Sequence, residues 1–167
     1  MRSKRIALLL TGAVATIAAA GCGDDDNDKT STTSSTKSMT TEVVDAPGAS
    51  VRFASPKDGS TQNGTVSARV SVSNFKLAAA SVGQKAKQGE GHLHFSMDGG
   101  KYDQPKYSGA NGKLAVKLGV QGKYSPAVTP TITYKKLPPG EHELEVYLAN
   151  NDHSDTGVEA KTSFTVK

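Results

Sequence analysis

The 167-residue chain has no tryptophan, a single cysteine and few aromatic residues, which make up 5% of the sequence. One cysteine cannot form a disulfide within the chain, so a small disulfide-stabilised fold is excluded. Only one stretch is comparable in length and apolarity to a membrane-spanning helix, which excludes a multi-span membrane protein. No collagen or heptad repeat is present. Because no cluster of lysine and arginine is interleaved with aromatic residues, we expect no nucleic-acid binding.

The N-terminal segment has the three parts of a secretory signal peptide. Three of the first five residues are basic, residues 6–20 are uncharged and mostly apolar, and small residues precede Cys22. The sequence Ala-Ala-Gly-Cys at 19–22 resembles the lipobox of bacterial lipoproteins. This resemblance implies that residues 1–21 are a lipoprotein signal peptide and that the Cys22 thiol carries a lipid of the diacylglycerol (palmitate) type. An ordinary signal peptide with an unrelated cysteine is the alternative.

Residues 22–47 are predicted to be the lipidated cysteine followed by a disordered linker. The segment is rich in Ser, Thr and Asp and has no apolar periodicity. Such a composition cannot bury enough apolar surface to offset the loss of chain entropy on folding. Its acidic run at 24–28 is interpreted as a solvated spacer rather than a cation-binding tail. We therefore expect a domain tethered to a membrane in the cell envelope, on its extracytoplasmic side.

Residues 48–167 are predicted to fold as one all-β domain. Apolar and polar residues alternate with a period of two, and turns rich in Gly and Pro separate the alternating stretches. This pattern is typical of an antiparallel β-sandwich. No capped helical period is apparent. Residues 99–129 are expected to be a long glycine-rich loop region with one short strand, marked by Leu114, Val116 and Leu118.

Four segments of this domain carry a family resemblance. They are Ser55-Pro56-Lys57-Asp58-Gly59, Gly91-His92-Leu93-His94, Pro139-Gly140-Glu141-His142-Glu143-Leu144-Glu145-Val146 and Asn151-Asp152-His153-Ser154. Together they are similar to an uncharacterised group of secreted bacterial immunoglobulin-like lipoproteins. The resemblance implies an immunoglobulin-like β-sandwich with Greek-key connections, and it brings no established activity.

Three of the four histidines form a predicted metal site. His92 and His94 lie two residues apart on one strand, so they share a face, which is predicted to point outward. In an immunoglobulin-like topology this strand is C, and it pairs antiparallel with strand F at 141–150. His153 follows strand F and should therefore lie beside them, with Asp152 in the same turn. Three imidazoles with a nearby carboxylate suit zinc or copper, whereas simple surface polarity is the alternative.

Two other kinds of copper site are excluded by the numbers of histidine and cysteine residues. A copper–zinc superoxide dismutase site needs six histidines and this chain has four, while a blue-copper site needs a cysteine that the domain lacks.

Met97 is predicted to face the core. His142 is predicted to point inward as a half-buried residue that hydrogen-bonds turn backbone, with a role as a metal ligand as the alternative. Glu143 and Glu145 are interpreted as a solvated face.

The sequence thus predicts a membrane-anchored, non-enzymatic binding module of the cell envelope, with a protein or glycan ligand. No nucleophile elbow, phosphate-binding loop or metalloprotease helix motif is present. One alternative is a mononuclear zinc- or copper-binding lipoprotein that uses His92, His94 and His153. Another is a metal-dependent enzyme in which Asp152 assists. The last is a structural or adhesive surface domain that uses the tyrosine-bearing 99–129 region.

Overall fold

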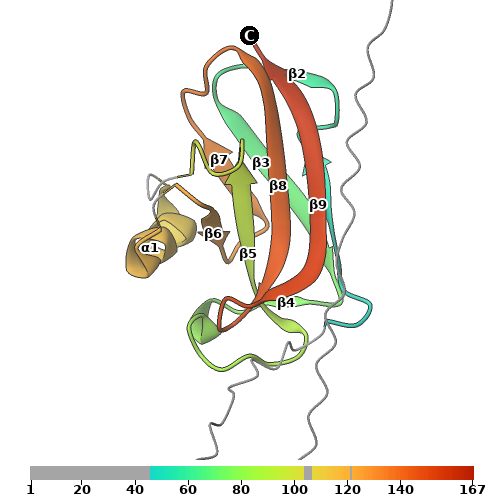
Figure 1. The fold of residues 1–167 in the computed structure, drawn as a ribbon, viewed down its shortest axis with the longest axis vertical. Coiled ribbons are helices and arrows are strands. Elements are labelled where there is room, and N and C mark those ends of the chain that lie inside the picture. The colour runs from blue at the N-terminus through green and yellow to red at the C-terminus, as the bar shows by residue number, and fades with distance from the viewer. Residues whose placement is uncertain (1–45, 104–106, 121) are drawn as a thin grey trace, which may run out of the picture. The chain divides into compact units, whose positions relative to one another are not determined.

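The computed structural model describes residues 46–103, 107–120 and 122–167, which form two β-sheets (Figure 1). The smaller sheet has the order β1-β3-β7, with β1 (Ser50–Ser55), β3 (Val66–Ser73) and β7 (Thr131–Tyr134). The larger sheet has the order β2-β9-β8-β5-β4. Its strands are β2 (Ser60–Gln62), β9 (Asp155–Val166), β8 (Gly140–Asn150), β5 (Glu90–Met97) and β4 (Lys76–Leu77), and β6 (Ser125–Ala127) also pairs with β5.

The strand order is that of an immunoglobulin-like sandwich. Strands β1, β3 and β7 take the places of strands A, B and E, and β5, β8 and β9 take those of C, F and G. The pairs β1–β3, β3–β7, β5–β8 and β8–β9 are all antiparallel. The predicted fold class is therefore confirmed. The predicted signal peptide, Cys22 and residues 22–45 of the predicted linker lie outside the described residues.

Alternation in the sequence builds the core between the two sheets. Each strand turns its apolar positions inward, so that Val66, Leu93 and Leu144 are fully or almost fully buried. Met97 is also fully buried in this core, as predicted. The core is made of small and medium apolar side chains with a few aromatic rings, including the contacting pair Phe53 and Phe95.

The prediction of a short strand at Leu114, Val116 and Leu118 is wrong, and the short strand of the 99–129 region is β6. Residues Gly109–Leu118 form an α-helix, α1, which lies beside β6 (Figure 1). The helix ends at Gly119, whose left-handed φ of 61° lets its N–H bond the carbonyls of Ala115 and Val116. Leu114 and Ala115 are buried whereas Val116 is exposed, which is a helical pattern rather than a strand pattern. A 3₁₀ helix, η1 (Ala79–Ser81), was also not predicted. Among the described residues, neither helix has the length and apolarity required to span a bilayer.

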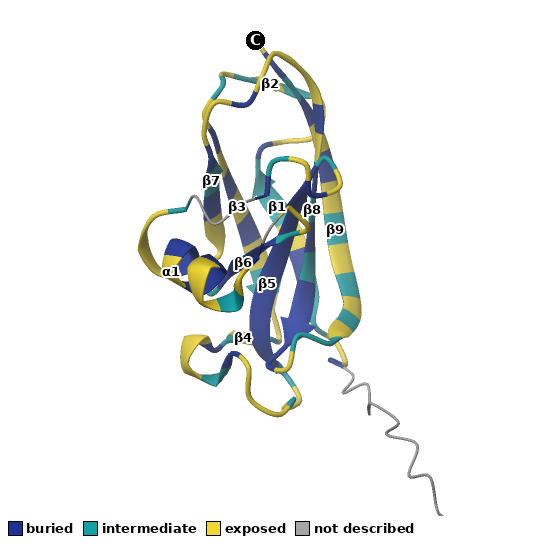
Figure 2. Ribbon diagram, turned by 60° about the vertical axis from the view of Figure 1, so that its left-hand side comes forward, coloured by how far each residue is buried: buried dark blue, intermediate teal, exposed yellow. Residues whose placement is uncertain are grey.

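Strand β5 is buried along its whole length, which corrects the prediction that the face carrying His92 and His94 points into solvent. Figure 2 shows β5 uniformly buried, with exposed positions confined to the elements around it. The two histidines are indeed on the face opposite Leu93 and Phe95, but His92 is 0% and His94 1% exposed. Strands β8 and β6 pair with β5, and side chains from outside β5 close over the histidines.

Candidate metal centre

Strand β5 fixes the positions of His92 and His94. It is hydrogen-bonded to β8 on one side and to β6 on the other, and His94 stands opposite Tyr147 of β8 and Pro126 of β6. His92 stands opposite Ala149 of β8. Because the strand is held at both edges, the two imidazoles project from a backbone that has little freedom to move.

The turn after β8 brings in the third histidine, as the predicted topology required. The His153 N–H donates to the carbonyl of Asn150 at 3.0 Å, and the Asn151 side-chain amide donates to the Glu90 carboxylate at 3.2 Å. The second bond ties the turn to the start of β5. His153 itself has a left-handed φ of 70°. A non-glycine residue is uncommon in this region, and Asn is among the residues that tolerate it best.

The three imidazoles converge, and we call His92, His94 and His153 the histidine cluster. The distance from His92 Nε2 to His94 Nε2 is 2.8 Å, and that from His92 Nε2 to His153 Nδ1 is 3.0 Å. One ring nitrogen from each residue can be chosen so that all three lie within 4.8 Å of one another. The convergence predicted from sequence is therefore present in the fold.

The hydrogen bonds of His92 cannot all be satisfied. A ring nitrogen has room for one proton or one lone pair, so His92 Nε2 can make one good hydrogen bond. It nevertheless has two ring nitrogens at hydrogen-bonding distance, at 2.8 and 3.0 Å. Its Nδ1 is buried and has no hydrogen-bond partner among the described residues. Buried polar groups are nearly always paired in proteins, so such an arrangement needs a physical explanation.

Two tyrosines hold His94 and were not identified from the sequence. Tyr147 Oη lies 2.7 Å from His94 Nδ1, the nitrogen that faces away from the cluster. The ring of Tyr124 stacks on His94 with a centroid distance of 3.9 Å and an interplanar angle of 17°. Burial raises the pKa of Tyr147 to about 12, so its hydroxyl stays protonated at neutral pH. The cross-strand position of Tyr147 opposite His94 was the signal that could have identified it.

Burial keeps the cluster uncharged. It lowers the pKa of His92 to about 4 and that of His94 to about 2, and the neighbouring imidazoles act in the same direction. The pKa of His153 is also lowered by burial, although the Asp152 carboxylate opposes this. Neutral imidazole is the form that binds a metal ion, so the cluster is in its ligand form at neutral pH.

Asp152 does not join the converging nitrogens. Its Oδ1 accepts hydrogen bonds from the N–H and hydroxyl of Ser154, at 3.1 and 2.7 Å. These bonds lower the pKa of the carboxyl group. The side chain is exposed and shapes the turn that carries His153.

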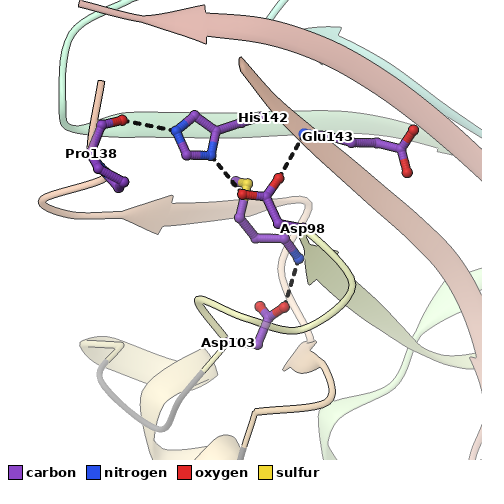
Figure 3. Close-up of polar contacts among 6 residues, drawn as sticks. Asp98, Asp103, Pro138, His142 and Glu143 are labelled. Carbon is purple, nitrogen blue, oxygen red and sulfur yellow. Dashed lines mark hydrogen bonds and ion pairs between the residues drawn. The ribbon is translucent and has the colours of Figure 1, made fainter. Parts of the chain in front are cut away.

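His142 lies away from the cluster and bridges two turns. Its Nδ1 is 2.7 Å from Asp98 Oδ2 and its Nε2 is 2.9 Å from the carbonyl of Pro138 (Figure 3). Asp98 also accepts a hydrogen bond from the N–H of Glu143 at 2.8 Å. The predicted inward orientation and bond to turn backbone are confirmed, but the residue is buried rather than half-buried.

Sequence reasoning also missed the buried carboxylate of Asp103. It is 0% exposed and accepts hydrogen bonds from the N–H of Met97 at 2.6 Å and from Tyr134 Oη at 2.7 Å (Figure 3 shows the first). The hydroxyls of Ser125 and Tyr107 donate to it as well. Burial raises the pKa of Asp103, and these four donors act against that shift. The carboxylate joins the 97–103 turn to β6 and β7.

Comparisons with known proteins do not assign this chain to a family. No protein-family model matches the chain, and no curated protein matches it. Among solved structures, the chain is similar to the fibronectin(III)-like modules of Clostridium thermocellum CbhA, with 14% sequence identity and a TM-score of 0.38. The match covers 70% of this chain and 96% of that one. The assignment of the fold therefore rests on the strand order described above.

Proposed function

We propose that this protein is a non-enzymatic metal-binding module, which holds one zinc or copper ion at the histidine cluster. The crowding at His92 is the observation that supports the proposal, because Nε2 faces two other ring nitrogens at 2.8 and 3.0 Å. Two hydrogen bonds cannot share one position on that nitrogen, whereas a cation can accept a lone pair from each of the three imidazoles. An ion placed among the three nitrogens would be bound at metal–nitrogen distances of about 2.0–2.1 Å.

The surroundings of the cluster favour binding of the ion. Metal-binding histidines usually hydrogen-bond through their other nitrogen, and Tyr147 Oη lies 2.7 Å from His94 Nδ1 in this role. Three imidazoles without a thiolate suit zinc or copper(II), with a water molecule in a remaining position. Catalysis would need an acid or base beside the ion, and Asp152, the nearest predicted one, is engaged by Ser154.

The setting we propose is the cell envelope. The lipobox-like sequence at Cys22 and the Ser/Thr/Asp-rich segment after it support a lipid anchor and a flexible tether. In this arrangement the domain would sample the space within a few tens of ångströms of a membrane, where it would bind the ion.

Calorimetric titration of the purified protein with zinc and with copper(II) tests the proposal. The informative variant is His153→Asn, because Asn tolerates the left-handed φ of 70° at this position and leaves the turn intact. The matched control is Asp152→Asn, which changes the adjacent residue and keeps the oxygen that accepts from Ser154. We expect one ion per wild-type chain, unchanged binding in Asp152→Asn, and at least about tenfold weaker binding in His153→Asn. Equal binding by both variants refutes the proposal.

A cavity next to α1 favours a second candidate function, the binding of a glycan. It has a volume of about 680 Å³ and lies between the start of α1 and β7, with Tyr102, Tyr107 and Lys135 among its lining residues. The Asn111 side chain in its wall donates to the Thr131 carbonyl at 2.7 Å, so the wall is fixed before any ligand binds. Aromatic rings combined with a few polar groups are typical of small-molecule pockets.

Nuclear magnetic resonance with an N-acetylglucosamine oligomer as probe tests this second function. We expect chemical-shift changes at the cavity, which Tyr102→Ala abolishes and which Tyr124→Ala, beside the histidine cluster, leaves in place. Shift changes spread over the surface, or the same changes in both variants, would exclude this cavity as the site.

A further inference from the structure

His92 lies in the middle of the histidine cluster. Its Nε2 is 2.8 Å from the His94 nitrogen and 3.0 Å from the His153 nitrogen. His94 and His153 are not hydrogen-bonded to each other. Their ring centroids are 5.8 Å apart, compared with 4.6 and 4.7 Å from each of them to His92. The cluster is thus a row with two short contacts and one long one.

This pattern distinguishes two kinds of metal geometry. In a tetrahedral zinc site with bonds of about 2.0–2.1 Å, every pair of ligand nitrogens is about 3.3–3.4 Å apart. In a square plane with bonds of about 2.0 Å, neighbouring nitrogens are about 2.8 Å apart and opposite ones about 4 Å. The observed 2.8 and 3.0 Å match the neighbouring pairs of a square plane, in which His94 and His153 are opposite each other.

Ring orientation agrees with the planar arrangement. The His94 and His153 rings are nearly parallel, at 19°, whereas His92 stands edge-on to them, at 65° and 83°. This orientation is compatible with His94 and His153 as opposite ligands and His92 as the central one.

The protein holds this arrangement before any ion binds. His92 and His94 are on a strand that is paired at both edges, and Tyr124 stacks on His94 at 3.9 Å. His153 is held by a turn that is tied to Glu90 through Asn151. A rearrangement into a tetrahedron would require His94 and His153 to approach each other, which would disturb the stack on Tyr124 or the turn.

We infer that the histidine cluster is a copper(II) site, in which three nitrogens form a T-shaped plane with His92 at its centre and His94 and His153 opposite each other. This inference rests on the proposed function, since it specifies the ion that the same cluster binds. Tetragonal nitrogen sites favour copper(II) and nickel(II) over zinc, and of these two ions copper(II) binds the more tightly in the Irving–Williams order. The position opposite His92 is then available to water or a small anion.

Electron paramagnetic resonance of the purified protein loaded with copper(II) tests the inference. We expect an axial spectrum with the large parallel hyperfine splitting of a tetragonal site, and nitrogen couplings that fit three imidazoles. His153→Asn should reduce the count to two, while Asp152→Asn keeps three. A rhombic spectrum with a strongly reduced parallel splitting would show a distorted tetrahedron and overturn the inference.

Cobalt(II) absorption gives an independent readout, because tetrahedral cobalt(II) has intense visible bands and other geometries have weak ones. Weak bands from a stoichiometrically loaded protein are expected, and intense bands would overturn the planar geometry. Either contrary result leaves the proposed function standing, because an ion is bound. If copper(II), zinc and cobalt(II) all fail to bind, the proposed function itself is wrong.

Discussion

Acidification should destabilise the metal-free protein steeply between pH 6.5 and pH 4. The pKa of His92 falls from its ordinary value of 6.5 to about 4, and that of His94 to about 2, because both rings are buried. Below pH 6.5 the unfolded chain takes up protons at these positions, whereas the folded chain keeps both rings neutral. The unfolded state therefore binds more protons, and the free energy of unfolding decreases as the pH falls.

The expected size follows from this difference in proton uptake. Each fully linked group changes the free energy of unfolding by roughly 1.4 kcal/mol per pH unit, so the two together contribute roughly 2.7 kcal/mol per unit. Domains of this size are stable by about 5–15 kcal/mol, so a fall of two pH units removes a large share of the total. His153, whose pKa is also lowered by burial, adds to the effect in the same direction.

Urea unfolding followed by circular dichroism at pH 7, 6 and 5, with a chelator present, measures this slope; the chain has no tryptophan to serve as a fluorescent probe. The comparison variant is His94→Gln, which removes the most strongly perturbed imidazole and should reduce the slope by roughly half. A change of less than about 1 kcal/mol between pH 7 and pH 5 in the wild type would show that the rings are accessible to protons in the folded state.

Three further predictions concern single positions. Tyr147→Phe should weaken metal binding by about tenfold in a calorimetric titration, because His94 Nδ1 loses the hydroxyl 2.7 Å away; unchanged affinity would show that this contact does not orient the ring. Gly91→Ala should unfold the domain or lower its stability by about 3 kcal/mol or more, since a Cβ there would lie 2.0 Å from the carbonyl oxygen of Ala149. A melting temperature equal to the wild type would contradict this packing. Asp103→Ala should lower the free energy of unfolding in urea by about 3 kcal/mol or more, because several buried donors lose their acceptor. A decrease below about 1 kcal/mol would contradict this role.

The β-sheet part of the fold could be predicted because its signal is local. Alternation along β3, β5, β8 and β9 places apolar residues on one face, and the same parity places His92 and His94 together on the other. The immunoglobulin-like order then brings the end of β8 to the start of β5, where Gly91 pairs with Asn150. The meeting of His153 with the other two histidines followed from topology and from no local pattern.

Helix α1 was not predicted because its apolar residues alternate with a period of two, as they do in a strand. Leu114, Val116 and Leu118 alternate with other residues, and only Leu114 and Ala115 among the apolar residues of the helix are buried. The better signals were its ends: Ser108 stands at the N-cap, and Gly119 closes the C-terminus in a left-handed conformation. Three alternating apolar residues are too short a pattern to predict a strand when both ends of the segment carry helix signals.

The burial of the histidines could not be read from β5 itself, because the side chains that cover it come from elsewhere in the chain. Tyr124 lies before β6, Tyr147 lies on β8 and His153 follows β8, so their contacts with His94 and His92 depend on the folded arrangement. A sequence pattern specifies on which face of the strand a side chain lies, and only tertiary packing specifies whether that face is exposed to solvent.

The cluster is also a poor choice if stability alone is considered. Apolar residues at 92 and 94 would fill the same fully buried positions without a crowded Nε2, without an Nδ1 that lacks a partner among the described residues, and without the acid sensitivity described above. Departures from consistent packing concentrate at functional sites, where the loss of stability is offset by what the site binds. Binding of an ion to the folded state alone would stabilise it, by roughly 4 kcal/mol when the free ion is a thousandfold above its dissociation constant. The instability that three converging imidazoles introduce in the metal-free domain is thus of the size that one bound ion can offset.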